Sequence, residues 1–131
     1  MLEQSKFIVG SVRDCESAYE ACLAHELQKQ GLNVILQKSV PVVYDSVKLE
    51  CGFRADLLVE NRVVVELKCK EQLHPVDHAQ ILSHLRLLGL HVGLLINFHV
   101  AVLKDGVCRV VDGYRPEDEP SIIEHETSLS G

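Results

Sequence analysis

The chain has 131 residues, of which 47% are hydrophobic and 5% aromatic, and its formal net charge is −6. This length suits one domain with an aliphatic core, and no apolar run reaches the length of a membrane span. The charge is uneven, so we divide the chain into a near-neutral domain, residues 1–111, and an acidic, mobile C-terminal tail, residues 112–131. Neither part has the basic excess of a dedicated nucleic-acid binder, and without a signal-peptide pattern we expect a cytoplasmic protein.

One helix and three strands are expected first. Residues 4–30 carry apolar side chains at spacings of three and four, which predicts a helix. Residues 33–44, 52–59 and 62–70 are rich in β-branched side chains and predict strands. Pro41 places the first of these strands at a bend or an edge.

A second helix follows at residues 74–89, with Pro75 at its start. Residues 91–98 form an apolar strand, and residues 100–111 a hairpin that turns at Asp105-Gly106. A helix between two strands lets the chain return parallel to the first. We therefore expect an α/β fold with a mixed sheet flanked by helices, in the order α-β-β-β-α-β-(β-hairpin).

Five cysteines are spread along the chain without a C-x-x-C pair: Cys15, Cys22, Cys51, Cys69 and Cys108. Their odd number and their spacing argue against a disulfide framework and against a zinc ribbon. We expect reduced thiols that are mostly buried, with Cys69 packed in the core.

The run VVVELKCK, residues 63–70, begins as a buried strand and then carries Glu66 and Lys68. Side chains alternate along a strand, so these two charges share one face. If the preceding turn has three residues, Asp56 lies opposite Glu66, ~5 Å away. A two-residue turn would instead place Asp56 opposite Val65 and separate the acids. In the first case the charges lie at a rim of the sheet and not in the core.

Two carboxylates at this distance repel unless a cation or a proton lies between them. Oxygen ligands favour Mg²⁺ or Mn²⁺ over zinc, and the backbone carbonyl of Leu67 could add a third oxygen. Lys68 would then stabilise developing negative charge, which suits phosphodiester hydrolysis. The alternative is an ordinary surface ion-pair network in which Arg54 and Lys68 neutralise the two acids.

Asp56, followed by Glu66-Leu67-Lys68 in this order of elements, resembles the PD-(D/E)XK nuclease superfamily. The segments ESAYEACLAHELQKQGLNV, RADLLVENRVVVELK, HAQILSHLRLLG and VGLLINF are similar to successive blocks of its GxxExxY family. The resemblance covers residues 6–111. It implies a restriction-endonuclease-like core around a mixed four-stranded sheet. It also implies a Mg²⁺-dependent nuclease of the RecB-like exonuclease type that acts on nucleic acid, for which we favour DNA over RNA while both stay open.

The resemblance also implies roles for individual residues. It makes Asp56 and Glu66 metal ligands together with the Leu67 carbonyl, and Lys68 a catalytic group. Further site residues are Glu16 near the metal, Gln80 as a partner of phosphate or of Lys68, and Tyr19 and His84 as substrate contacts.

Two positions depart from the family pattern. The signature glycine is replaced by Arg13, so the chain reads R-x-x-E-x-x-Y, and His84 stands where related nucleases carry a tyrosine. The altered motif and the near-neutral body leave a second reading open, a catalytically silent module that acts in protein binding or regulation. A homodimer that encloses substrate is also open, and a zinc site at His74 and His78 is disfavoured because no further ligand completes it.

Overall fold

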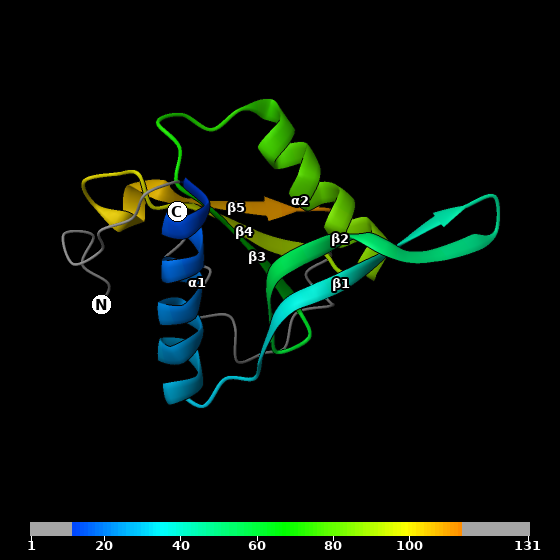
Figure 1. Ribbon diagram of the computed structural model, residues 1–131, viewed down its shortest axis with the longest axis horizontal. Coiled ribbons are helices and arrows are strands. Elements are labelled where there is room, and N and C mark those ends of the chain that lie inside the picture. Colours follow the sequence, from blue (N-terminus) through cyan, green and yellow to red (C-terminus); the bar gives the residue numbers. More distant parts are fainter. Residues whose placement is uncertain (1–11, 114–131) are drawn as a thin grey trace.

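The computed structural model describes residues 12–113 (Figure 1). Two α-helices and five strands, together with a short 3-10 helix at Leu103–Gly106, make up this part of the chain. In chain order the α-helices and strands are α1 (Val12–Lys29), β1 (Val34–Tyr44), β2 (Val47–Val59), β3 (Val63–Lys68), α2 (Pro75–Leu88), β4 (Val92–Asn97) and β5 (Val107–Val111). None of the described helices is long and apolar enough to cross a membrane.

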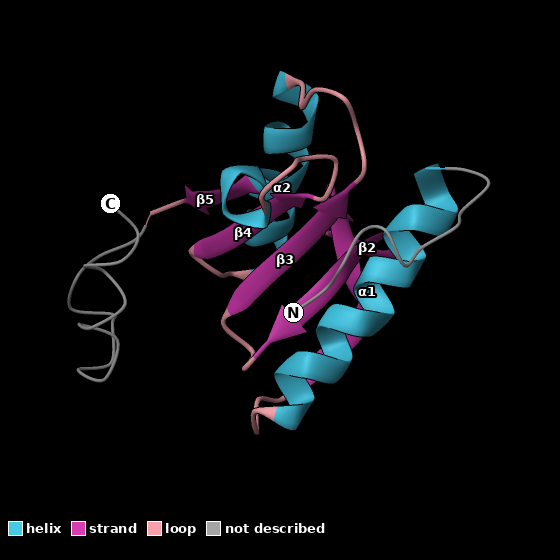
Figure 2. Ribbon diagram, turned by 90° about the vertical axis from the view of Figure 1, so that its left-hand side faces the viewer, coloured by secondary structure: helices cyan, strands magenta, loops and turns pink. Residues whose placement is uncertain are grey.

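The strands form one mixed sheet in the order β1-β2-β3-β4-β5. Strands β3 and β4 are parallel, and α2 is the crossover between them; the other neighbouring pairs are antiparallel. The two helices cover opposite faces of the sheet (Figure 2). The expected α/β class is confirmed, with five described strands instead of the four that the resemblance implied.

Alternate residues of the central strands supply two apolar layers, as the strand periodicity requires. On the α1 side, Tyr19 and Ala24 of the helix pack with Leu57, Val65 and Leu67 of the sheet. On the α2 side, the buried layer contains Val40, Ala55, Leu58, Val64, Ile81, Leu85, Leu95 and Val110. The predicted alternation along β3 is therefore confirmed, and the sheet is packed on both faces.

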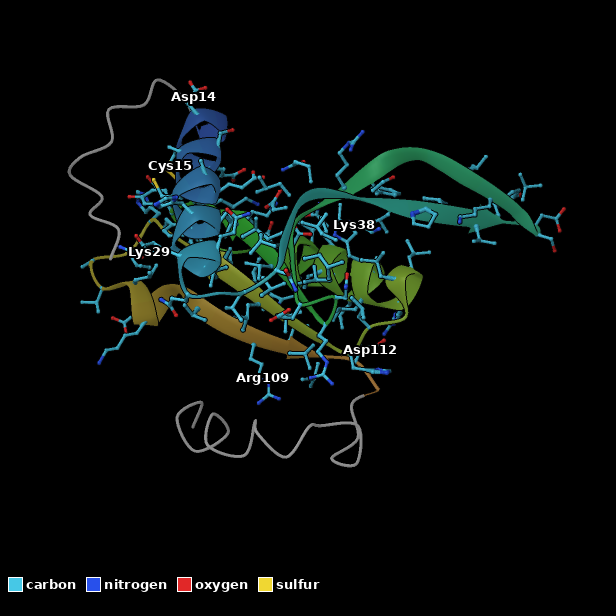
Figure 3. The ribbon with its side chains drawn as sticks, turned by 90° about the horizontal axis from the view of Figure 1, so that it is seen from below. Asp14, Cys15, Lys29, Lys38, Arg109 and Asp112 are labelled. Carbon is cyan, nitrogen blue, oxygen red and sulfur yellow. A yellow bond between two sulfur atoms is a disulfide. The ribbon has the colours of Figure 1, made fainter. Side chains whose placement is uncertain are left out.

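The hairpin of β1 and β2 extends beyond the body of the protein (Figure 1), and we call its outer part, residues 41–52, the arm. β1 is an edge strand, and its pairing with β2 shifts register between Val40 and Val42, at Pro41. The predicted bend or edge position of Pro41 is confirmed on both counts. Several apolar side chains of the arm are exposed, with Tyr44 at 75% and Val43 at 60%, and Lys38 lies where the hairpin leaves the body (Figure 3).

Three details differ from the expected elements or lie outside the described residues. The hairpin expected at residues 100–111 is wrong, because residues 103–106 form a short 3-10 helix and β5 pairs with β4. Gly106 makes this possible, since a side chain there would clash with the backbone carbonyl of Asn97. The expected start of the first helix, residues 4–11, and residues 114–131 of the acidic tail lie outside the described part.

The expectation of reduced thiols is wrong for two cysteines. Cys15 in the first turns of α1 forms a disulfide with Cys69, which directly follows β3, and their Cα atoms are 6.5 Å apart. The two positions are 54 residues apart in the chain and meet because α1 packs across β3. Cys22 and Cys108 are free and half-buried, and Cys69 is buried as expected.

Candidate active site

The length of the turn between β2 and β3 decides whether the two central acids meet. The turn has three residues, 60–62, and Val59 pairs with Val63. Glu60 and Asn61 both adopt a left-handed backbone, with φ of 54°. The expected odd-length turn is confirmed, and continuing its register brings Asp56 beside Glu66.

Asp56 lies where β2 begins to leave β3 and bend toward the arm. Its Oδ2 accepts a hydrogen bond from the backbone N–H of Leu67 at 2.8 Å, which takes the place of the next ladder bond. Its Oδ1 lies 3.5 Å from the side-chain nitrogen of Gln37, which also donates to both oxygens of Glu20 in α1 at 2.9 and 3.0 Å. Asp56 is therefore fixed from the backbone of β3 and from the α1 side.

Glu66 is buried, with 3% of its surface exposed, so the expectation that it lies at a rim is wrong. Its Oε1 is 2.6 Å from Nδ1 of His84, whose side chain is 2% exposed. Burial raises the pKa of Glu66, the hydrogen bond with His84 opposes this rise, and the nearby carboxylate of Asp56 adds to it. A polar side chain is tolerated at this depth because it has a hydrogen-bond partner.

Lys68 lies on the same face as Glu66 and also meets α2. Its Nζ donates to Oε1 of Gln80 at 3.2 Å and is 3.9 Å from Oδ1 of Asp77. The lysine is partly exposed, with 16% of its side chain accessible. The prediction that Gln80 is placed to orient Lys68 agrees with this contact, whereas its contact with a phosphate stays a prediction.

Asp77 is a buried residue beside the site that was not among the site residues expected from the sequence. It is 3% exposed, its Oδ1 accepts a hydrogen bond from Nζ of Lys70 at 2.7 Å, and its Oδ2 accepts one from the backbone N–H of His74 at 2.8 Å. Burial acts to raise the pKa of Asp77, but the bonds from His74 and Lys70 outweigh it and hold the pKa below its ordinary value. The available signal was an acid at the third position of a helix that begins with proline, the N-terminal capping pattern.

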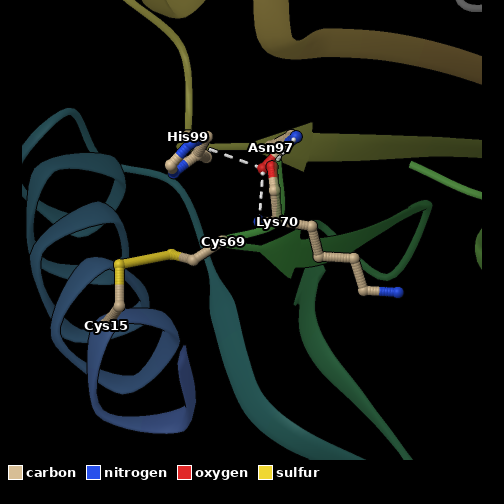
Figure 4. The surroundings of a disulfide bond; sticks show 5 residues. All are labelled: Cys15, Cys69, Lys70, Asn97 and His99. Carbon is tan, nitrogen blue, oxygen red and sulfur yellow. Dashed lines mark hydrogen bonds between the residues drawn. A yellow bond between two sulfur atoms is a disulfide. The ribbon is translucent and has the colours of Figure 1, made fainter. Parts of the chain in front are cut away.

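Asn97 is a second residue that the sequence reasoning missed. It is 5% exposed, and its side chain bonds the segment after β3 (Figure 4). Its Oδ1 accepts from the backbone N–H of Lys70 at 3.1 Å and of His99 at 3.2 Å, and its Nδ2 donates to the carbonyl of Lys70 at 2.9 Å. The side chain thus holds the chain beyond Lys68 in the plane of β4.

Glu16 reaches the same region from the opposite helix. Burial raises its pKa; the charge of Lys68 and a hydrogen bond from the backbone of Cys69 oppose the rise. The charge of Asp56 raises the pKa further, so the two carboxylates are close enough to interact. The structure therefore brings Glu16, Asp56, Glu66, Lys68 and Gln80 together around the end of β3.

Tyr19 and His84, expected as substrate contacts, are both 2% exposed. Tyr19 stacks on Phe98, with ring centroids 4.0 Å apart and planes at 7°, so it is a core residue one turn beyond Glu16. His84 is held against Glu66 in the layer under α2. Both rings are therefore buried in this structure, and their contact with substrate stays a prediction.

The donors at the end of β3 fit a hard divalent cation by their chemistry. The carboxylates of Asp56 and Glu66 lie close enough to interact, and the backbone carbonyl of Leu67, the residue after Glu66, is a further oxygen donor. Burial is the main reason that the pKa of Glu66 is raised, and the charge of Asp56 adds to the rise; a cation would relieve that second contribution. Among residues 12–113, no group of three or more histidine, cysteine or acidic side chains is arranged to hold a metal ion by itself. A site here therefore needs backbone or solvent oxygens.

A mixed sheet with facing acids and a lysine at the end of its central strand defines the class of restriction-endonuclease-like proteins. Comparison with protein families agrees: the PD-(D/E)XK nuclease superfamily matches residues 11–110, and the chain belongs to that superfamily. The crystal structure of an alkaline exonuclease from Laribacter hongkongensis is similar over 94% of this chain and 67% of that chain, with a TM-score of 0.54 and 16% identity. A search of curated proteins found no match.

Proposed function

We propose that this protein is a divalent-metal-dependent nuclease that hydrolyses phosphodiester bonds of nucleic acid, with DNA favoured over RNA. The observation that carries the proposal is the pair of facing carboxylates, Asp56 and Glu66, next to a lysine that is directed by Gln80 and Asp77. Membership of the nuclease superfamily supports the same conclusion. The four similar sequence blocks further suggest the GxxExxY branch.

In this proposal Asp56, Glu66 and the Leu67 carbonyl would hold Mg²⁺ or Mn²⁺, with Glu16 nearby. Such an ion activates water and offsets phosphate charge. Lys68 lies two residues beyond Glu66 on the same face of β3 and is our candidate for stabilising negative charge on the substrate. The side-chain oxygen of Gln80 accepts a hydrogen bond from the ammonium group of Lys68 and so restricts where that group points.

The test is cleavage of labelled single- and double-stranded DNA and RNA with Mg²⁺, Mn²⁺ or a chelator. We expect Asp56→Asn, Glu66→Gln and Lys68→Met each to lower the rate by a factor of about 100 or more, as loss of one preorganised charge does. Glu26→Gln on α1 and the exposed Lys104→Met remove matched charges outside the site and are expected to cleave like wild type. Equal rates in wild type and all three site variants would contradict catalysis at this site.

Metal binding is measured separately from activity. Because the carboxylates repel in the metal-free protein, Mn²⁺ is expected to raise the melting temperature of wild type, and Asp56→Asn is expected to abolish the rise. If Mn²⁺ still raises the melting temperature of Asp56→Asn, the metal binds somewhere other than the proposed site.

A second candidate is a catalytically silent module that acts in protein binding, and the arm favours it. Tyr44, Val43 and Val47 at its end are 75%, 60% and 57% exposed, an unusual concentration of apolar side chains on a projecting hairpin. The partner could be a second copy of the chain. Light scattering of wild type and of Tyr44→Ser/Val47→Ser tests this: a dimer that the substitutions dissociate supports it, and a monomer in both excludes the homodimer.

A further inference from the structure

The disulfide lies between two residues that each adjoin a site residue. Cys15 directly precedes Glu16 on α1, and Cys69 directly follows Lys68 at the end of β3 (Figure 4). The bond therefore joins the two elements that carry the site at the point where their charged groups meet.

Hydrogen bonds around the disulfide also connect α1 to the end of β3. The backbone of Cys69 bonds the carboxylate of Glu16, so one residue holds α1 covalently through its side chain and non-covalently through its backbone. On the other side of Cys69, the backbone of Lys70 is bonded by the side chain of Asn97. The chain around Cys69 is thus held by the side chain of Asn97, and we infer that the disulfide holds the first turns of α1 against it.

The remaining attachment of α1 begins further along the helix. Tyr19 and Ala24 are its buried core residues, and Tyr19 stacks on Phe98 one turn beyond Glu16. Helix ends open more readily than packed helix centres. Among the described contacts of Glu16, the hydrogen bond with the backbone of Cys69 is the one that would still join it to the strand after the disulfide is reduced.

We propose that the Cys15–Cys69 disulfide is a reducible tether that positions Glu16 at the metal site, so that reduction weakens divalent-metal binding. This rests on the proposed function. In the reduction a dithiol gives up two electrons and two protons: the bond between the two sulfur atoms breaks, two thiols form, and the dithiol closes its own disulfide. Cys15 is half-buried whereas Cys69 is 7% exposed, so we expect the dithiol to attack the sulfur of Cys15.

A disulfide that only stabilises the fold would behave differently. It would raise the melting temperature without changing the affinity of the folded protein for metal, and Glu16 would not matter to its effect. Coupling between the redox state and the carboxylate of Glu16 therefore separates a positioning role from a structural one.

The experiment measures Mn²⁺ binding to the full chain by calorimetry, first oxidised, then after reduction and anaerobic removal of the dithiol. Mass spectrometry establishes the Cys15–Cys69 bond in the oxidised sample. We expect reduction to weaken binding about tenfold, the size of effect seen when an outer partner of a metal site is lost. Cys15→Ser/Cys69→Ser should match the reduced protein in both conditions, and Cys22→Ser, which removes a free half-buried thiol, should respond like wild type.

Glu16→Gln is the decisive variant, because it should bind Mn²⁺ weakly and equally in both redox states. Equal affinity of oxidised and reduced wild type, an undiminished redox effect in Glu16→Gln, or absence of the bond from the oxidised protein would each overturn the tether. If Mn²⁺ binds in neither state, the proposed metal site fails. The tether is then decided by hydrogen exchange of the first turns of α1, where faster exchange on reduction supports it and unchanged exchange overturns it.

Discussion

Replacing His84 with leucine removes the hydrogen-bond partner of the buried Glu66 carboxylate and puts an apolar side chain of similar size in its place. Glu66 and His84 are 3% and 2% exposed and 2.6 Å apart. A hydrogen bond to a charged group contributes ~1.5–3 kcal/mol, and a buried charge left alone costs ~3–5 kcal/mol. Because burial already raises the pKa of Glu66, uptake of a proton limits the loss. We therefore expect a decrease of about 2–3 kcal/mol in the free energy of unfolding, near the lower of these ranges.

The assay is urea denaturation of the metal-free protein at pH 7, with thermal melting as a second measure. At about 4 °C per kcal/mol for a chain of this size, the melting temperature should fall by about 8–12 °C. The double variant Glu66→Leu/His84→Leu replaces the whole pair by apolar groups and should be more stable than His84→Leu alone. His78→Leu on the same helix is the matched control. A loss below about 0.5 kcal/mol in His84→Leu, within the range of ordinary surface substitutions, would refute the reasoning, as would additive losses in the double variant.

Three further changes test the surroundings of the site. Asp77→Asn should lower the free energy of unfolding by about 1–2 kcal/mol at pH 7. The pKa of Asp77 in the folded protein lies below its ordinary 3.8, so the difference in stability between wild type and variant should fade as pH drops through that folded pKa. A stability difference that stays constant between pH 7 and pH 2 would count against this role of Asp77. Gly93→Ala places a methyl group 2.7 Å from Cδ1 of Ile81 and should cost about 1–3 kcal/mol in thermal melts, of which Ile81→Val should recover part. Asn97→Leu should accelerate amide exchange at Lys70 and His99, whose N–H groups it leaves unpaired, and unchanged exchange at both would show that the side chain does not hold this segment.

The fold was open to sequence reasoning where periodicity and turn length decide it. The alternation along residues 63–68 placed Val65 and Leu67 behind the sheet and Glu66 with Val64, as found. The register followed from one assumption, the three-residue turn. Residues 100–111 misled because Asp105-Gly106 is also compatible with a 3-10 helix, and what selects between them is the close approach of Gly106 to Asn97.

The supports of the site were harder to predict because they come from other elements. The depth of Glu66 depends on how closely α2 covers β3, and no strand pattern contains that distance. The disulfide depends on the packing of α1, which brings together two cysteines 54 residues apart. In both cases the sequence contains the residues, while the contact is made by tertiary packing.

One sequence pattern did indicate which residues of α2 contact the charged residues at the end of β3, but it is visible only when the two elements are compared. Polar residues of α2 at positions 77, 80 and 84 contact Lys70, Lys68 and Glu66 in reverse order. The seven residues from 77 to 84 rise ~10 Å along the helix, and the four residues from 66 to 70 rise ~13 Å along the extended chain. Because these lengths are similar, one face of an antiparallel helix can contact alternate side chains of the strand. A crossover helix with polar residues at spacings of three and four, opposite a strand with charges at alternate positions, therefore predicts a buried polar seam. Here that seam explains why β3 can carry Glu66 in the interior.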